Sequence, residues 1–363
     1  MYKYLKLITL FALGFIFASC QEDDDKKSNL PTTYNFDNAD YSGQTERLNQ
    51  LTEMTNYIKT VNQGGKIELQ VLLDMFENAN GNANCNFGFN SAKQLRDKTS
   101  ENAIETITGF MSNLADISGT SDNGEYGKIG IVSSGNSQYL FNETGLEYQQ
   151  LIEKGLMGAC FFHQITNVYL SSDKMNVENN VNEEGKNYTT MEHHWDEAFG
   201  YLGANENWPI DLTGQKFWAS YSQKSNSDAT NGLLNSPQTL IDAFIKGRVA
   251  INNKDYSERD EQIKVIIEQL EIVSATTAIN YINGALDEFS DDALRNHRLS
   301  EAYAFIWDLQ FININYRKIS LNEINDLLDQ LGFDYYAISI DQLNSIKNKL
   351  SEIYGLDAIK DQL

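Results

Sequence analysis

Proline and cysteine are scarce in this sequence, and each scarcity excludes a class of structure. Three prolines in 363 residues leave long stretches free to form uninterrupted helices. Three cysteines are too few for the disulfide framework of a small secreted domain. Cys85 and Cys160 could form one bridge, but two free thiols are the simpler expectation. Burial in an apolar helix should raise the pKa of Cys160, which argues against a catalytic thiol.

Positive charge is also scarce. The chain has 28 Lys and Arg against 51 Asp and Glu, a formal net charge of −23. This excess repels phosphate backbones, so we expect no binding to nucleic acid. Beyond the first twenty residues, no segment approaches the roughly 20 apolar residues that a transmembrane helix needs. The motifs His-Glu-x-x-His, Glu-x-x-His, Gly-x-Ser-x-Gly and Gly-Lys-Ser/Thr are absent too.

The first twenty residues have the layout of a secretory leader. Lys3 and Lys6 precede an apolar run at 7–18, which has the length of a signal-peptide core. The run ends in Phe-Ala-Ser-Cys, which resembles a lipobox. We therefore predict a signal peptide at 1–19 and an acyl group on Cys20.

An acidic run, Gln-Glu-Asp-Asp-Asp, follows Cys20 directly. It resembles the surface-export signal of bacteroidete lipoproteins, whereas the alternative is a solvated tether. We expect residues 20–40 to form a flexible tether to the outer membrane. The protein would then be exposed at the cell surface or, as the alternative, face the periplasm.

Helical periodicity dominates the rest of the chain, and the fold class that it predicts is all-α. Only 128–132 and 138–141 are expected to form strands, as one small hairpin. We expect a single helical domain at 41–363, made of two packed bundle-like halves at about 41–203 and 237–363, with long Gly/Asn-rich loops. The expected helices cover 48–61, 67–76, 91–117, 146–170, 189–202, 237–252, 256–289, 291–315, 320–332 and 340–361.

The segment at 191–201, Met-Glu-His-His-Trp-Asp-Glu-Ala-Phe-Gly-Tyr, carries the first candidate site. On a helix, His194 and Glu197 fall together beside a buried stripe. An imidazole and a carboxylate at this spacing can bind one cation or hydrogen-bond each other.

A second helix has a similar flank, where His297 and Glu301 lie four residues apart. If the two helices pack side by side, His194, Glu197, His297 and Glu301 converge into a site for Zn, Fe or Mn. The alternative is that each pair is a solvated or hydrogen-bonded pair, which is common on helices.

The aromatic segment at 203–236 offers a different kind of site. Trp208, Trp218 and Tyr221 could line a groove for a glycan or a protein, or they could clamp a long loop to the core.

The leader, the acidic run, His193 to Tyr201 and Leu299-Ser300-Glu301-Ala302-Tyr303 resemble a group of bacteroidete lipoproteins distantly related to the imelysins. The resemblance implies an all-helical fold of two bundle-like halves with a Gly-x-His-x-x-Glu motif near their seam. It also implies an association with iron uptake, and the founding members were described as peptidases. The motif's histidine and glutamate fall on His194 and Glu197, whereas Glu192 stands where the motif has glycine.

These observations favour a non-enzymatic surface lipoprotein that binds a metal ion, haem or an iron-loaded small molecule. A His-x-x-Glu metallopeptidase is one alternative, and it would need a third ligand and an open coordination position. A glycan- or protein-binding lipoprotein that uses the segment at 203–236 is the other.

Overall fold

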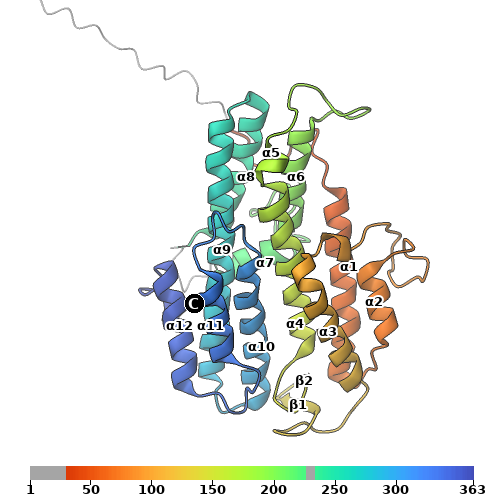
Figure 1. The fold of residues 1–363 in the computed structure, drawn as a ribbon, viewed down its shortest axis with the longest axis vertical. Coiled ribbons are helices and arrows are strands. Elements are labelled where there is room, and N and C mark those ends of the chain that lie inside the picture. The colour runs from red at the N-terminus through yellow and green to blue at the C-terminus, as the bar shows by residue number, and fades with distance from the viewer. Residues whose placement is uncertain (1–29, 226–233) are drawn as a thin grey trace, which may run out of the picture. The chain divides into compact units, whose positions relative to one another are not determined.

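Helices form most of this structure, a computed structural model that describes residues 30–225 and 234–363 (Figure 1). The predicted signal peptide at 1–19 and the predicted acylated Cys20 lie outside the described residues. Residues Pro31–Leu363 form one compact unit. The all-α class and the small hairpin are confirmed, and in the part of the chain that is described no helix is both long and apolar enough to cross a membrane.

The first half of the chain holds the hairpin and several short helices. The hairpin strands pair antiparallel, with Gly130 opposite Phe141. The elements in order are α1 (Ser42–Lys59), η1 (Thr60–Gln63), α2 (Leu69–Glu77), η2 (Arg96–Lys98), α3 (Glu101–Ile117), β1 (Gly130–Ser134), β2 (Ser137–Phe141), α4 (Tyr148–Leu156), the π-helical η3 (Met157–Phe162) and η4 (Gln164–Tyr169), α5 (Ser172–Met175) and α6 (Thr190–Leu202).

The second half contains longer helices. Pro237 lies in the first turn of α8, where its missing N–H does not interrupt the helix. The elements are α7 (Phe217–Ser225), α8 (Ser236–Asn253), α9 (Tyr256–Asp287), α10 (Asp292–Asp308), η6 (Leu309–Phe311), α11 (Leu321–Leu331), α12 (Ile340–Tyr354) and η7 (Lys360–Gln362).

Two central helices join the halves. In Figure 1 the long α9 runs beside α8 and α10, and it also contacts α7 and α12. The segment from α4 to η4 is buried on almost all sides and packs against α3, α1 and α10. Its stretch at Met157–Phe162 is apolar almost all round, which suits this central position. Because α4 packs against α10, and α6 against α8, the two halves share one continuous core.

The start of α6 agrees with the helix expected at 189–202, and a side chain caps it. Thr189 accepts a hydrogen bond from the backbone N–H of Glu192, and the Glu192 side chain accepts one from the N–H of Thr189. This reciprocal pair is a capping box, and it lies at the start of the helix expected at 189–202. The expected helix at 340–361 instead ends at Tyr354, because Gly355 takes the left-handed conformation that closes a helix.

The predicted helix at 91–117 begins ten residues too early. Ser91 to Ser100 is a loop with one short helical turn, and α3 begins at Glu101. The Nε2 of Gln50 and the Nδ2 of Asn78 both donate hydrogen bonds to the backbone oxygen of Lys93. These long-range bonds satisfy the backbone there without a helix, which local periodicity cannot reveal.

The predicted tether at 20–40 is also too long. From Pro31 the chain packs on the helical unit, and Tyr34 is fully buried. The Tyr34 ring stacks on Phe199 with centroids 3.8 Å apart, and its hydroxyl donates to Asp196 at 2.6 Å. One anchored tyrosine fixes this segment despite its polar composition.

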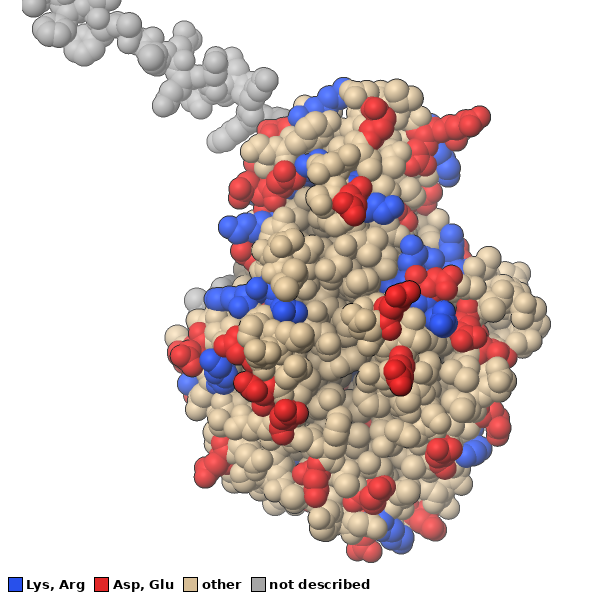
Figure 2. Space-filling model, in the orientation of Figure 1, with Lys and Arg blue, Asp and Glu red and all other residues tan. Residues whose placement is uncertain are grey.

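Both cysteines in the described part of the chain are free, as expected. Cys160 is buried, and burial raises the pKa of its thiol to about 12. On the face drawn in Figure 2, acidic and basic side chains are interspersed with wide areas that carry neither.

Candidate functional site

His194 lies on α6 and is buried, with 8% of its surface exposed. Its Nδ1 is 2.9 Å from the backbone oxygen of Lys174, so Nδ1 carries the proton and donates it. Its Nε2 then holds the lone pair, and the Lys174 ammonium lies 3.4 Å from it. Burial lowers the pKa of His194 and favours the neutral ring. The atom that could bind a metal therefore faces a cation.

Glu197 does not bond to His194. Its Oε1 accepts hydrogen bonds from Gln44 Nε2 at 2.8 Å and from the Tyr169 hydroxyl at 3.0 Å. His193 Nε2 lies 3.9 Å from the other carboxylate oxygen. Burial, with Glu197 beside it, raises the pKa of Tyr169 and keeps the hydroxyl protonated as a donor. Glu197 thus closes a hydrogen-bond network between α6, α1 and η4.

His297 and Glu301 on α10 do come together. His297 Nε2 is 3.4 Å from Glu301 Oε2, and His297 Nδ1 is 2.6 Å from Glu147 Oε2. The imidazole stacks on the Tyr139 ring of β2, with centroids 4.2 Å apart. Burial alone would lower the pKa of His297, but the carboxylates of Glu147 and Glu301 raise it above its ordinary value.

A buried lysine completes this cluster. Lys154 on α4 has 5% of its surface exposed, and its Nζ lies 3.0 Å from Glu153 and 3.7 Å from Glu301. Burial would lower the pKa of Lys154, but the two glutamates raise it, so the ammonium stays charged. His297, Glu301, Lys154 and Glu153 therefore form a buried set of paired charges.

The predicted four-residue metal site does not form. α6 packs against η4, α8 and α1, whereas α10 packs against α4 and α9. The partners of the His194/Glu197 pair and of the His297/Glu301 pair have no residue in common. Across residues 30–225 and 234–363, no group of three or more His, Cys, Asp and Glu is placed to hold a metal ion.

On α6, the counterpart of His297 is His193 rather than His194. His193 and Glu197 have the same four-residue spacing as His297 and Glu301. The His193 ring also stacks on a tyrosine, Tyr188, with centroids 4.6 Å apart. Helical spacing pointed to His194 instead, because His194 and Glu197 fall together beside the buried stripe of α6.

A cleft of about 610 Å³ opens beside the buried charges, between α1, η1, β2, α4, α7 and α10. We call it the α4–α10 cleft. Its lining combines amide, charged and aromatic side chains. The lining residues are Thr52, Thr55, Asn56, Lys59, Asn62, Gln63, Gln138, Tyr139, Gln149, Gln150, Glu153, Lys154, Lys216, Phe217, Ser220, Tyr221, Lys224, His297 and Glu301.

The aromatic segment at 203–236 contributes to the cleft, but not through its tryptophans. Trp208 and Trp218 are 1% and 0% exposed, and their indole N–H groups donate to Gln215 and to the backbone oxygen of Met157. They clamp the segment to the core and cannot stack on a ligand. Phe217 and Tyr221, on α7, line the cleft instead.

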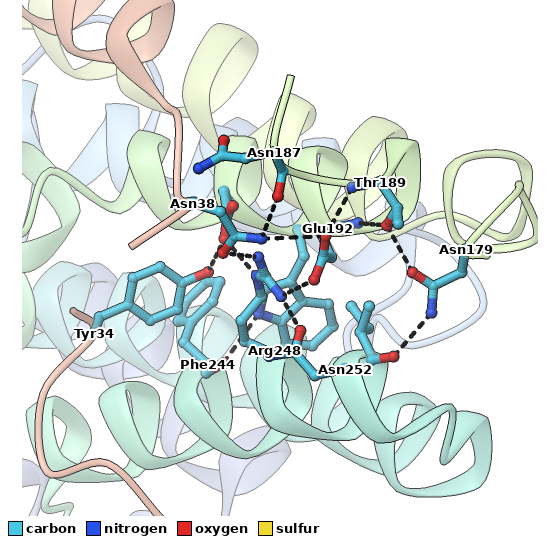
Figure 3. Close-up of polar contacts among 12 residues, drawn as sticks. Tyr34, Asn38, Asn179, Asn187, Thr189, Glu192, Phe244, Arg248 and Asn252 are labelled. Carbon is cyan, nitrogen blue, oxygen red and sulfur yellow. Dashed lines mark hydrogen bonds and ion pairs between the residues drawn. The ribbon is translucent and has the colours of Figure 1, made fainter. Parts of the chain in front are cut away.

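A second buried network, drawn in Figure 3, surrounds Arg248 of α8. Arg248 is fully buried and donates to Asp196 at 3.0 Å, to Glu192 at 2.8 Å and to Asn38 at 2.8 Å. Burial raises the pKa of Asp196 to about 6, although Arg248 opposes this shift. The network connects α8 to α6 and to the N-terminal segment, so its role is structural.

Sequence reasoning missed Lys154, Glu153 and Glu147. A signal was present, because Glu153 and Lys154 form a charged pair inside an otherwise apolar helical segment. Charges are seldom fully buried without partners, so such a pair indicates that other charged residues lie close by.

Neither a curated protein nor a solved structure matches this chain. One family model matches residues 31–357, and its description is "Domain of unknown function (DUF4856)". The match begins where the described fold begins and covers most of the sequence. The chain therefore belongs to the DUF4856 family.

Proposed function

We propose that this protein is an exported, lipid-anchored binding protein that holds a small polar ligand in the α4–α10 cleft. The leader and the lipobox-like sequence that ends at Cys20 support export and anchoring. The ligand site is supported by the geometry of the cleft and the charges at its wall.

One observation carries the proposal: paired buried charges border an open cavity rather than filling a closed core. Lys154, Glu301 and His297 all line the cleft. Desolvating such groups is costly, and an apolar cluster of similar volume would stabilise the fold at least as well. Perturbed titratable groups around a cavity of this size are typical of binding sites.

The ligand that we propose is an organic molecule, with or without bound iron, rather than a bare metal ion. A bare Zn, Fe or Mn ion needs several protein ligands around it. His194 Nε2 faces the Lys174 ammonium, and the two nitrogens of His297 are already paired with Glu147 and Glu301. The metallopeptidase alternative needs a metal with an open coordination position, so we do not propose it.

Ligand binding is tested by a thermal-shift screen of polar metabolites on the full-length protein, followed by calorimetry. Ser220→Trp places an indole in the cleft and should abolish binding of any ligand found. Ser257→Trp, on the exposed start of α9, is the matched control and should bind normally. Binding that survives Ser220→Trp would place the ligand elsewhere and overturn the proposal.

Anchoring is tested separately by cell fractionation. Cys20→Ser should move the protein from the membrane fraction to the soluble fraction, because the acylated thiol is lost. Cys85→Ser changes an exposed free cysteine and should leave the protein in the membrane fraction. Retention of the Cys20→Ser variant in membranes would contradict a lipid anchor at this residue.

A further inference from the structure

The α4–α10 cleft is locally cationic in an acidic protein. Lys59 and Lys154 lie near Glu153, at 3.6 Å and 3.0 Å, so part of their charge is balanced. Lys216 and Lys224 line the same cleft, and neither has a carboxylate within ion-pair distance among the described residues.

Among the described residues, neither lysine has a carboxylate in direct contact, although Glu53 attracts Lys216, and Glu301 and Glu153 attract Lys224, from a longer distance. The Lys216 ammonium donates to Asn49 Oδ1 at 2.7 Å and to Thr52 Oγ1 at 3.2 Å. The Lys224 ammonium lies over the Tyr221 ring, 4.4 Å from its centroid. Burial removes part of the hydration of the Lys216 ammonium and so lowers its pKa. An anion bound between these groups would offset that loss of hydration.

The parts of the cleft formed by α4 and α10 carry hydrogen-bond acceptors. Gln150 is almost fully buried and donates through Nε2 to Gln149 at 3.1 Å, whereas its Oε1 has no partner among the described residues. Buried amide oxygens are normally hydrogen-bonded, so this one favours a ligand with an O–H or N–H donor. The Glu301 carboxylate, which lines the same cleft, is a further acceptor.

Aromatic rings supply the remaining surface. Tyr139, Phe217 and Tyr221 line the cleft, and Tyr139 is held in place by its stack on His297. Flat apolar rings among polar side chains suit a ligand that has both hydroxyl groups and an apolar face, such as a pyranose.

We propose that the cleft binds an acidic sugar, meaning a pyranose that carries a carboxylate. Lys216 and Lys224 bind the carboxylate, Gln150 and Glu301 accept from the ring hydroxyls, and the rings of Tyr139 and Phe217 contact the C–H face. This assignment rests on the binding function proposed above. The cleft volume of about 610 Å³ lies within the range for small-molecule sites.

Other ligand classes fit the charges less well. Arginine and lysine both bind phosphate, but none of the lining residues is an arginine that could hold two phosphate oxygens at once. Glu153 and Glu301 would also repel a dianion. A neutral sugar would leave the charges of Lys216 and Lys224 unbalanced.

The test is isothermal titration calorimetry of the full-length protein with D-galacturonate and D-glucuronate. D-galactose and D-glucose are the ligand controls, because they have a CH₂OH group in place of the carboxylate. Acetate and inorganic phosphate test for binding of a plain anion. Lys216→Met and Lys224→Met remove one charge each. Lys264→Met, which removes an exposed lysine 3.9 Å from Glu268, is the matched control.

We expect one of the two uronates to bind at least about tenfold more tightly than its neutral counterpart, acetate or phosphate. Each cleft variant should weaken uronate binding about tenfold, since a charged hydrogen bond is lost. Neither variant should weaken neutral sugars, Lys264→Met should bind normally, and added salt should weaken the uronate.

Three results would overturn the assignment. The first is equal binding of a uronate and its neutral counterpart. The second is equal binding of acetate or phosphate, which would make the cleft a plain anion site. The third is unchanged uronate binding in both cleft variants. If no sugar binds but another ligand binds and is blocked by Ser220→Trp, the acidic sugar is refuted and the binding function stands. If nothing binds, both proposals fail.

Discussion

Replacing Arg248 with methionine should destabilise the fold more than any other single change in a charged residue of the N-terminal segment or α8. Methionine approximates the aliphatic part of arginine but leaves Asp196 without its cation. Arg248 and Asp196 are both fully buried, and their nitrogen and oxygen are 3.0 Å apart. Removing one partner of such a pair costs about 3–5 kcal/mol of unfolding free energy.

The loss should depend on pH. Burial raises the pKa of Asp196 to about 6, above the ~3.9 of an unfolded aspartate. A carboxyl raised in this way contributes stability that is full below the unfolded pKa and is lost as the pH rises through the folded pKa. Wild type therefore loses this contribution between about pH 4 and pH 6. Without Arg248 the pKa climbs further, so the variant keeps losing stability above pH 6 and its deficit is larger at pH 8 than at pH 5.

Urea unfolding followed by circular dichroism at the two pH values measures both effects. Adding Asp196→Asn to the variant removes the unpaired charge and should recover about 1–3 kcal/mol at pH 8. Arg298→Met is the control, because its ion pair with Glu288 is partly exposed and should contribute about 1 kcal/mol or less. A loss below about 1 kcal/mol for Arg248→Met, or an equal loss at both pH values, would refute the reasoning.

Three further changes test the buried polar groups by the same urea assay. Asp308 is fully buried, neither of its oxygens has a partner among the described residues, and burial raises its pKa well above the ordinary value. The contribution of Asp308 to the free energy of unfolding is therefore lost as the pH rises above about 4. Asp308→Asn should stabilise the fold by about 1 kcal/mol or more at pH 8 but little at pH 4. Destabilisation at pH 8 would contradict this. Lys154→Met removes the buried ammonium that pairs with Glu153 and Glu301 and should cost about 3–5 kcal/mol, and a smaller loss than for Lys264→Met would show that the cluster is not held together by charge. Thr189→Ala removes the cap of α6 and should cost about 1 kcal/mol, whereas Thr189→Ser should restore most of it.

The sequence predicted the helices because helical order is a local property. The spacing of Trp195, Ala198 and Phe199 identified the buried face of α6, and all three are fully buried. The capping box of Thr189 and Glu192 can also be recognised in the sequence, since both residues lie within one turn.

What the sequence could not predict is which helices meet. His194 and His297 have similar helical flanks, but only the packing of α10 on α4 decides that His297 faces Glu147. For the same reason, the sequence does not show which charged residues meet at the α4–α10 cleft. The adjacent Glu153 and Lys154 indicate that other charged residues lie close by, but the partner Glu301 is far away in sequence and local spacing does not identify it. The packing of helices that are far apart in sequence, and not the residue type, decides which side chains become partners.

The Arg248 network also bears on the order in which parts of the chain fold. Asn38 and Arg248, which share a hydrogen bond, are separated by 210 positions in the chain. Synthesis proceeds from the N-terminus, so the segment around Tyr34 is complete long before α8 exists. Contacts of such high sequence separation carry a large loop-closure cost and tend to form late. We therefore expect the first segment of the folded unit to be made to be among the last to be fixed in place. Until then, Asp196 lacks its hydrogen bonds from Tyr34 and Arg248.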